Sequence, residues 1–300
     1  MMSQSSHSSS RGGPREVTRR DIRKGRLGMI GTFSAGSDRL RYEIHGSGPQ
    51  ALVWLHALFL DAQVHRDLAA ALAARGHRVV LLDLLGHGES DKPRHASAHR
   101  MDLYAEDVVQ LLDELKIDQA VLGGVSLGAN VSLLAAVRAP DRVRGLVVVM
   151  PVLEWAVPAA AAAFVPLLLS VHYARPVVRM LARGVARAPR TGVGAIDSML
   201  DTLSTDPDEL AAVIHGLLVG PIAPTVEQRR AIRVPGLVLG QRVGLIHPFS
   251  DADNLARQLP NGRLGRTHSA ARLLMRPGEL TDELDDFLTE TWGRRTEAVS

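Results

Sequence analysis

The chain has 300 residues, 46% of them hydrophobic, and it contains no cysteine. This length and apolar content fit a globular domain with a substantial core, and the lack of cysteine excludes disulfides, thiolate metal ligands and a cysteine nucleophile. A net charge of +3 at pH 7 is too small to indicate nucleic acid as a partner.

The first 25 residues are rich in Ser, Arg and Gly and have almost no apolar side chains. Such a segment cannot bury enough surface to offset the entropy of ordering, so we predict a disordered basic tail over 1–25. It lacks the apolar region of a secretory signal, which makes a cytoplasmic location the expectation. The apolar tract 145–171 approaches membrane-span length, but Glu154 and three prolines interrupt it, and we expect no membrane span.

Strand-like and helix-like patterns alternate through the first half of the chain. Strands are predicted at 39–45, 51–55, 78–83, 120–123 and 146–150, with helices at 64–75, 101–115 and 128–138 between them. This alternation predicts an α/β fold, a mostly parallel sheet with helices on both faces.

From residue 152 the pattern becomes helical, with helices predicted at 159–171, 175–187, 195–204 and 207–219. Asp206 is the predicted N-cap of the last of these, with Pro207 at its first helical position. Strands at 236–240 and 263–266 and a helix at 279–292 complete the sheet pattern. We therefore predict a core formed by 26–151 and 232–293, with 152–231 inserted as a helical cap that serves as a lid.

The most specific motif is Gly124-Val125-Ser126-Leu127-Gly128, between a predicted strand and a predicted helix. A serine at a sharp strand-to-helix turn needs a strained backbone, and side chains two residues before and after it would collide with neighbouring elements. The pattern predicts a nucleophile elbow in which Ser126 is exposed and the N–H of Leu127 supplies half of an oxyanion hole. An ordinary glycine-rich turn is the alternative, and the strand and helix on either side favour the elbow.

Over residues 32–290 the chain resembles the α/β-hydrolase fold family, in its serine-nucleophile branch. The elbow, the turn Val53-Trp54-Leu55-His56-Ala57-Leu58 and the segment 82–93 (LDLLGHGESDKP) carry the resemblance, in matching order and spacing. It implies that Leu58 donates the second oxyanion N–H, with Ala57 in place of the usual glycine. It also implies structural roles for Asp83 and His87.

The resemblance places an acid and then a histidine downstream of the serine. The acid slot, four residues before Pro248, holds Gly244. The usual histidine slot holds Ala270, so His268, two residues earlier, is the candidate base. Glu154, after the preceding strand, is the candidate acid, although a solvated or helix-capping carboxylate is an equally weighted alternative. Asp251 and Asp253, which are nearer in sequence, are interpreted as first-turn helix residues.

Other histidines have local explanations. His247 lies on the loop that normally bears the acid and is the alternative base, although a loop-packing role is more common for a histidine beside a proline. His56 belongs to the oxyanion turn and is interpreted as structural. His215 falls within a predicted cap helix, where a satisfied core histidine is the simpler interpretation.

The predicted cap is dominated by Ala, Val and Leu, which favours an apolar acyl substrate over a sugar or a polyanion. The sequence has no phosphate-binding loop, and we expect neither a cofactor nor a metal. Arginines at 175, 179, 183 and 187 would form one stripe on a helix. Such stripes are most often solvated, and the sharper alternative is a docking surface for an acidic carrier protein or an anionic substrate tail.

These patterns predict a serine-dependent hydrolase or acyltransferase that acts on an ester or thioester through an acyl-enzyme. Ser126 would attack the carbonyl, His268 would transfer the proton, and Glu154 would orient the histidine. The alternative is a non-hydrolytic or catalytically impaired member of the fold that binds a ligand or catalyses a cyclisation or elimination, because Gly244 stands where the acid belongs.

Overall fold

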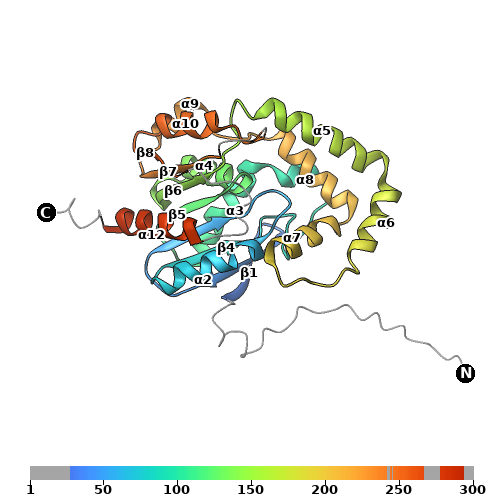
Figure 1. Ribbon diagram of the computed structural model, residues 1–300, viewed down its shortest axis with the longest axis horizontal. Helices are drawn as coiled ribbons and strands as arrows, with labels where there is room; N and C mark the ends of the chain where they lie inside the picture. The colour runs from blue at the N-terminus through green and yellow to red at the C-terminus, as the bar shows by residue number, and fades with distance from the viewer. Residues whose placement is uncertain (1–27, 242–243, 245, 267–277, 294–300) are drawn as a thin grey trace, which may run out of the picture.

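The computed structural model describes residues 28–241, 244, 246–266 and 278–293. Within them, the strands form one sheet in the order β1-β2-β4-β3-β5-β6-β7-β8 (Figure 1). β1 and β2 are antiparallel to each other, β2 is antiparallel to β4, and the remaining neighbours are parallel. The strands are β1 (Met29–Ala35), β2 (Asp38–His45), β3 (Ala51–Leu55), β4 (Arg78–Leu82), β5 (Ala120–Val125), β6 (Val143–Val149), β7 (Gly236–Leu239) and β8 (Gly262–Leu264).

The central strands are buried along their whole length, as in β3 and β5. Continuous apolar strands of this kind are typical of parallel sheets that helices cover on both faces. Residues of α3 (Met101–Glu114), α4 (Leu127–Arg138) and α10 (Phe249–Gln258) pack on one face. Those of α2 (Arg66–Ala74) and α12 (Gly278–Gly293) pack on the other. The predicted α/β fold with a mostly parallel sheet is confirmed.

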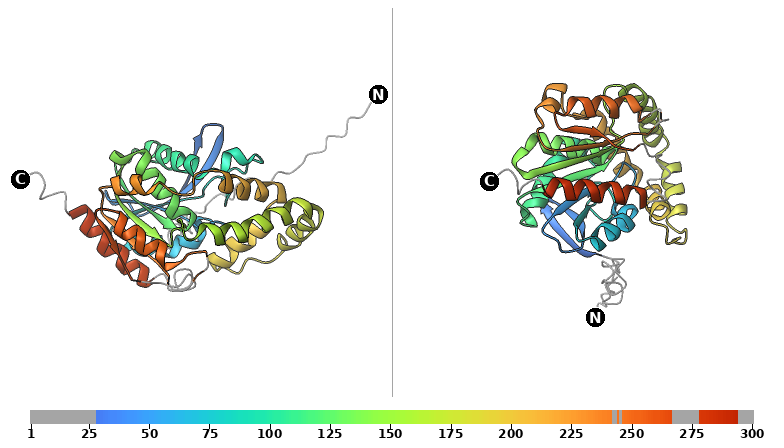
Figure 2. Two further views of the ribbon diagram at one scale, coloured as in Figure 1. Left: turned by 90° about the horizontal axis from the view of Figure 1, so that it is seen from above. Right: turned by 60° about the vertical axis from the view of Figure 1, so that its left-hand side comes forward.

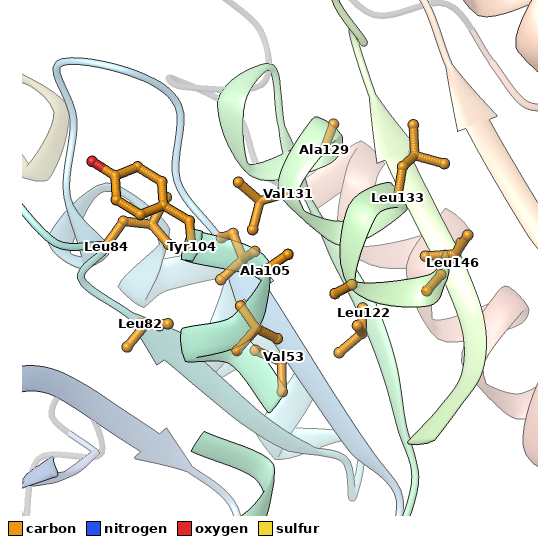
Figure 3. Close-up of a cluster of buried hydrophobic side chains, with 14 of the residues drawn as sticks. Val53, Leu82, Leu84, Tyr104, Ala105, Leu122, Ala129, Val131, Leu133 and Leu146 are labelled. Carbon is orange, nitrogen blue, oxygen red and sulfur yellow. The ribbon is translucent and has the colours of Figure 1, made fainter. Parts of the chain in front are cut away.

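Alternate side chains of the strands build the core layer under α3 and α4. Figure 3 shows this layer, in which strand side chains meet the buried faces of the two helices. The labelled strand residues are Val53, Leu82, Leu122 and Leu146, and the labelled helix residues include Ala105, Ala129 and Leu133. Short helices connect the larger elements: η1 (Ala62–His65), η2 (Ala96–His99), η3 (Pro140–Arg142) and α9 (Val226–Ala231).

Strand β1 is not among the strands that the sequence pattern predicts. Its sequence, MIGTFSA, includes a glycine, and only Phe33 and Ala35 are buried in it. The alternation of exposed and buried residues in β1 covers only the four residues from Thr32 to Ala35. Four residues are the shortest run that indicates a strand, so the signal in the sequence is weak.

Four helices follow β6 and are called the cap helices here: α5 (Val157–Tyr173), α6 (Arg175–Val185), α7 (Gly194–Leu203) and α8 (Pro207–Val219). Their bounds lie within two residues of those predicted. Asp206 caps α8 as expected, since its carboxylate accepts a hydrogen bond from the N–H of Asp208, at 2.9 Å. Figures 1 and 2 show the cap helices at the end of the molecule away from α12.

One buried carboxylate ties the start of the cap to the sheet. Asp251, in the first turn of α10, accepts hydrogen bonds from the N–H groups of Leu153 at 2.8 Å, Trp155 at 3.1 Å and Ala156 at 3.1 Å. The prediction that Asp251 lies in a first helical turn is correct. Its position also satisfies three backbone donors where the chain leaves β6 for α5.

We predict that Asp251→Asn lowers the free energy of unfolding by about 2 kcal/mol, because an amide cannot accept all three bonds and leaves buried N–H groups unpaired. Urea unfolding would measure this loss. Asp253→Asn is the matched control on the same helix. It breaks only a surface i,i+4 pair with Arg257 and should cost no more than about 0.5 kcal/mol. Equal losses in the two variants would contradict the anchoring role of Asp251.

Candidate active site

Ser126 stands between β5 and α4 with a backbone that few residues other than glycine adopt. Its φ is 54° and its ψ is −107°. Two hydrogen bonds hold this conformation: the N–H of Ser126 donates to the carbonyl of Val149, at 2.9 Å, and the N–H of Asn130 donates to the carbonyl of Ser126, at 3.1 Å. Backbone strain of this kind costs on the order of 1–3 kcal/mol and persists only where the surrounding structure enforces it.

The two glycines of the motif face the same carbonyl oxygen. A Cβ on Gly124 would lie 2.5 Å from the oxygen of Leu55, and a Cβ on Gly128 would lie 2.4 Å from it. Both distances are shorter than any tolerable contact. Any side chain at either position would push β5 or α4 away from the end of β3. The glycine pattern therefore has the steric origin that the sequence indicates.

The turn after β3 brings further backbone donors to the same place. The N–H of Leu60 donates to the carbonyl of Ala57, at 3.1 Å, which closes a turn around Leu58 and Phe59, and Phe59 has a φ of 65°. Leu58 and Leu127 line one cavity together with Ser126. As the first residue of α4, Leu127 has an N–H that the helix itself does not use.

The side chain of His56 holds this turn in place through two hydrogen bonds. Its Nε2 accepts the N–H of Leu84, at 3.0 Å, so its Nδ1 carries the proton and donates to the carbonyl of Ala57, at 2.9 Å. Burial lowers the pKa of His56, which keeps the ring neutral. These bonds agree with the structural role expected for His56 and orient the peptide that precedes Leu58.

Asp83 and His87 lie in the turn that follows β4. The Asp83 carboxylate accepts hydrogen bonds from the backbone of Ala62 and Glu89 and from the guanidinium of Arg41. The side chain of His87 is buried, and its Nδ1 lies 3.1 Å from the carbonyl of Leu85. Neither residue lines the cavity at Ser126, in keeping with their expected structural roles.

The side chain that meets Ser126 is His247. Its Nε2 lies 2.8 Å from the Oγ of Ser126, a hydrogen-bond distance. Desolvation by burial lowers the pKa of His247, so the neutral ring is favoured near pH 7. A neutral imidazole nitrogen at this distance can accept the hydroxyl proton, which is the arrangement an activated serine requires.

The cavity above Ser126 measures about 240 Å³, and most of its lining is apolar. Besides Ser126 and His247, its polar side chains are those of Asn130 and His65. The Asn130 amide is fully used, since it bonds the backbone of Val152 and Ile222. The cap contributes Ala160, Phe164, Ile214, Leu217 and Leu218 to the wall.

Glu154 lies elsewhere in the described structure. Its carboxylate accepts a hydrogen bond from the buried guanidinium of Arg229 in α9, while 60% of its side chain is exposed. Partial burial alone would raise the pKa of Glu154, but the bond from Arg229 outweighs it and lowers that pKa. Among the residues described, no hydrogen bond joins Glu154 to His247.

The structure describes only one of the remaining predicted positions. His268 and Ala270 lie outside the described residues. Gly244 is described, and a Cβ there would lie 2.0 Å from the amide nitrogen of Gln241 and 3.2 Å from the carbonyl oxygen of His247. A side chain in the acid slot therefore requires the end of Gln241 to move.

Sequence reasoning did not single out His65, which also lines the cavity. Its ring packs edge-on against Trp54, and its Nε2 has no hydrogen-bond partner in the described part of the chain. Burial, with a smaller effect from His56, lowers the pKa of His65 to about 3. No local pattern marks this residue, because it faces the cavity only through the packing of η1 on β3.

Part of the chain is similar to known proteins. The family model described as alpha/beta hydrolase fold matches residues 50–173. The chain is 38% identical to 2-hydroxymuconate semialdehyde hydrolase of Pseudomonas sp. (strain CF600) over 104 residues, 35% of this chain and 33% of that protein. It is 32% identical to a putative 2-succinyl-6-hydroxy-2,4-cyclohexadiene-1-carboxylate synthase of Bacillus subtilis (strain 168) over 114 residues, 37% of this chain and 41% of that protein.

The chain thus spans about a third to two fifths of the length of these two curated relatives. Among solved structures, the enol-lactonase from Burkholderia xenovorans LB400 superposes with a TM-score of 0.69 at 22% identity, over 86% of this chain and 100% of that one. At this identity the likeness shows the fold alone. The elbow at Ser126, the sheet order and these matches together show that the chain has the α/β-hydrolase fold, and residues 50–173 match the model of that family.

Proposed function

We propose that this protein is a hydrolase or acyltransferase in which Ser126 attacks an acyl carbonyl and His247 accepts the serine proton. The observation that carries the proposal is the 2.8 Å contact between Ser126 Oγ and His247 Nε2 at the floor of an apolar cavity. The names of a relative, a semialdehyde hydrolase, and of a structural neighbour, an enol-lactonase, support a hydrolytic activity.

The proposed reaction begins with the neutral His247 ring. Its Nε2 takes the hydroxyl proton as Oγ forms a bond to the carbonyl carbon, and the carbonyl electrons move onto the oxygen. The N–H groups of Leu58 and Leu127 stabilise that oxyanion. When the tetrahedral intermediate collapses, the imidazolium returns its proton to the departing alkoxide or thiolate. Water or another acceptor then attacks the carbonyl of the acyl-enzyme while His247 takes its proton. His247 returns that proton to Ser126 Oγ as the acyl group leaves.

The proposed substrate class follows from the cavity. A wall built from Leu58, Phe164, Ile214 and Leu217 removes water from an apolar group but offers few partners to a sugar or a phosphate. Its volume of about 240 Å³ suits a small acyl portion. We therefore propose an apolar ester, lactone or thioester as the substrate. Turnover measurements with water and with other acyl acceptors would identify the acceptor.

In this proposal His247 replaces His268 as the base, and the serine and histidine act as a dyad. Glu154 was the candidate acid from the sequence, but its carboxylate pairs with Arg229. A dyad keeps part of the rate enhancement, because the third residue chiefly orients the imidazole and stabilises the imidazolium.

A second candidate function is a non-hydrolytic reaction, such as a cyclisation or elimination, or ligand binding. Gly244 in the acid slot favours it, and one relative is named a synthase. In that case His247 would act on the ligand as a general base, with Ser126 as a hydrogen-bond donor and not as a nucleophile.

Our first test of function is Ser126→Ala. We expect the variant to fold, to lose labelling by a fluorophosphonate, and to lose hydrolysis of short p-nitrophenyl esters by on the order of 1,000-fold or more. Ser132→Ala is the control, because its hydroxyl only bonds the carbonyl of Gly128 within α4. A wild-type protein that never labels, with full activity of Ser126→Ala on its substrate, would favour the non-hydrolytic reaction.

The second test compares the two histidines. His247→Gln should lower kcat by on the order of 1,000-fold with little change in KM, since the ring acts in the transition state. His268→Gln should stay within a few-fold of wild type. The reverse pattern, with His268→Gln inactive and His247→Gln active, would assign the base to His268.

The third test asks whether a carboxylate assists the histidine. Without one, NMR titration should give the His247 ring a pKa below 6.5, since burial lowers it, and kcat/KM should rise with pH through that value as the ring loses its proton. Glu154→Gln should then alter kcat less than about threefold. Gly244→Asp adds a carboxylate beside the backbone of His247, and if that carboxylate reaches the ring it should raise the ring's pKa. A ring pKa above 6.5 in the wild type, or a large loss of kcat in Glu154→Gln, would argue against a dyad.

A further inference from the structure

The outer surface of helices α5 and α6 exposes more large apolar side chains than a surface helix normally does. In α5 only Ala160 and Val171 are buried, and in α6 only Ala182 is. Helix α8 packs against one side of α5, and Phe164 of α5 packs against Phe59 after β3. The exposed apolar side chains of the pair are Val157, Val165, Leu167, Leu169, Tyr173, Val177, Met180 and Leu181.

These two helices form a corner that projects from the domain. They meet at a bend of 96°, and Figures 1 and 2 show them at the outer end of the molecule, away from α12. No single described helix is long and apolar enough to cross a bilayer, although the bent pair together meets that length and composition. A corner bent this sharply fits helices that lie in the plane of an interface.

The charged side chains of α5 and α6 themselves are all positive. Between Glu154 and Asp197 the sequence has no acidic residue and carries five arginines. Arg175 and Arg179 are paired with acidic side chains at the start of α8. Arg183 and Arg187 are exposed, and neither has an acidic partner among the residues that the structure describes. The arginine stripe thus divides into an inner pair that holds α6 on α8 and an outer pair that is available.

We propose that the corner formed by α5 and α6, the cap corner, docks on the surface of a membrane that contains anionic lipid. Apolar side chains flanked by arginine are the composition of helices that lie in a lipid interface, with the apolar face among the acyl chains and the guanidinium groups at the phosphates. A group of large apolar side chains exposed on two adjacent helices is unfavourable in water and indicates a binding surface. The arginines select the anionic bilayer as the partner over an uncharged apolar one.

Docking would place one wall of the cavity next to the bilayer. Ala160 and Phe164 of α5 line the cavity above Ser126, while other residues of the same helix form the exposed corner. An apolar ligand dissolved in the membrane would then reach the cavity along α5. The docking itself does not depend on which residue carries the chemistry.

The test is sedimentation of the full chain with lipid vesicles. We expect binding to vesicles of phosphatidylcholine with 30% phosphatidylglycerol, weaker binding to phosphatidylcholine alone, and a decrease with salt. The double variant Met180→Glu/Arg183→Glu should reduce binding about tenfold or more. The double variant Met29→Glu/Arg233→Glu is the matched control. It makes the same change in charge at an equally exposed methionine, 67% exposed against 64%, and at an exposed arginine outside the cap, and should bind like wild type.

Circular dichroism and thermal unfolding establish that each variant is folded, and Met180→Ala/Leu181→Ala tests the apolar contribution without a change in charge. This variant should bind several-fold more weakly. Three results would overturn the proposal. The first is a wild type that does not bind anionic vesicles. The second is an equal loss of binding in Met180→Glu/Arg183→Glu and in the control Met29→Glu/Arg233→Glu. The third is a dimer that Met180→Glu/Arg183→Glu dissociates in sedimentation velocity while vesicles remain unbound, which would make the corner a contact between two copies.

Discussion

The site depends on one close approach, that of the Leu55 carbonyl oxygen to Gly124 and Gly128. Because β5 and α4 both pass this oxygen at a distance that excludes a Cβ, the chain must reverse direction within three residues, and Ser126 takes a φ of 54°. The turn that carries Leu58 begins directly after Leu55, so the same contact sets the relative positions of nucleophile and N–H donors. The strain at Ser126 is therefore offset by the packing of the whole central sheet, which is why the hydroxyl can be held in a fixed direction.

Helix α10 joins His247, the proposed base, to the cap helices. His247 precedes Pro248, the N-cap of α10, and Asp251 in the first turn of that helix holds the backbone of Leu153, Trp155 and Ala156. A displacement of α10 would change the distance from His247 to Ser126 and the start of α5 together. The position of His247 relative to Ser126 and the shape of the cavity wall are thus coupled through one short helix.

The sequence predicted the features that arise from local sterics and periodicity. The elbow can be predicted because its glycines and serine lie within five consecutive residues. Helix α8 can be predicted because Asp206 and Pro207 mark its start. The partners of Ser126 cannot be predicted in this way, because they depend on where distant loops pass. No local pattern ranks His247 above His268, and the pairing of Glu154 with Arg229 joins residues 75 positions apart. Strand β1 is missed for another reason: its alternation of exposed and buried residues covers only Thr32 to Ala35, which is too short to give a strong strand signal.

The apolar cavity imposes opposite demands on His247. Desolvation keeps the ring neutral and able to accept a proton, but it also makes the imidazolium costly to form. In a complete triad a carboxylate offsets that cost. Glu154, the acid that the sequence suggests, is bonded to Arg229. In the proposed dyad, the negative charge that faces the imidazolium is the oxyanion itself. In a low-dielectric cavity these two opposite charges attract strongly. A dyad of this kind depends on its oxyanion donors more heavily than a triad does. The rigid support of Leu58 through His56 and of Leu127 through the elbow is therefore the feature on which the proposed reaction depends most.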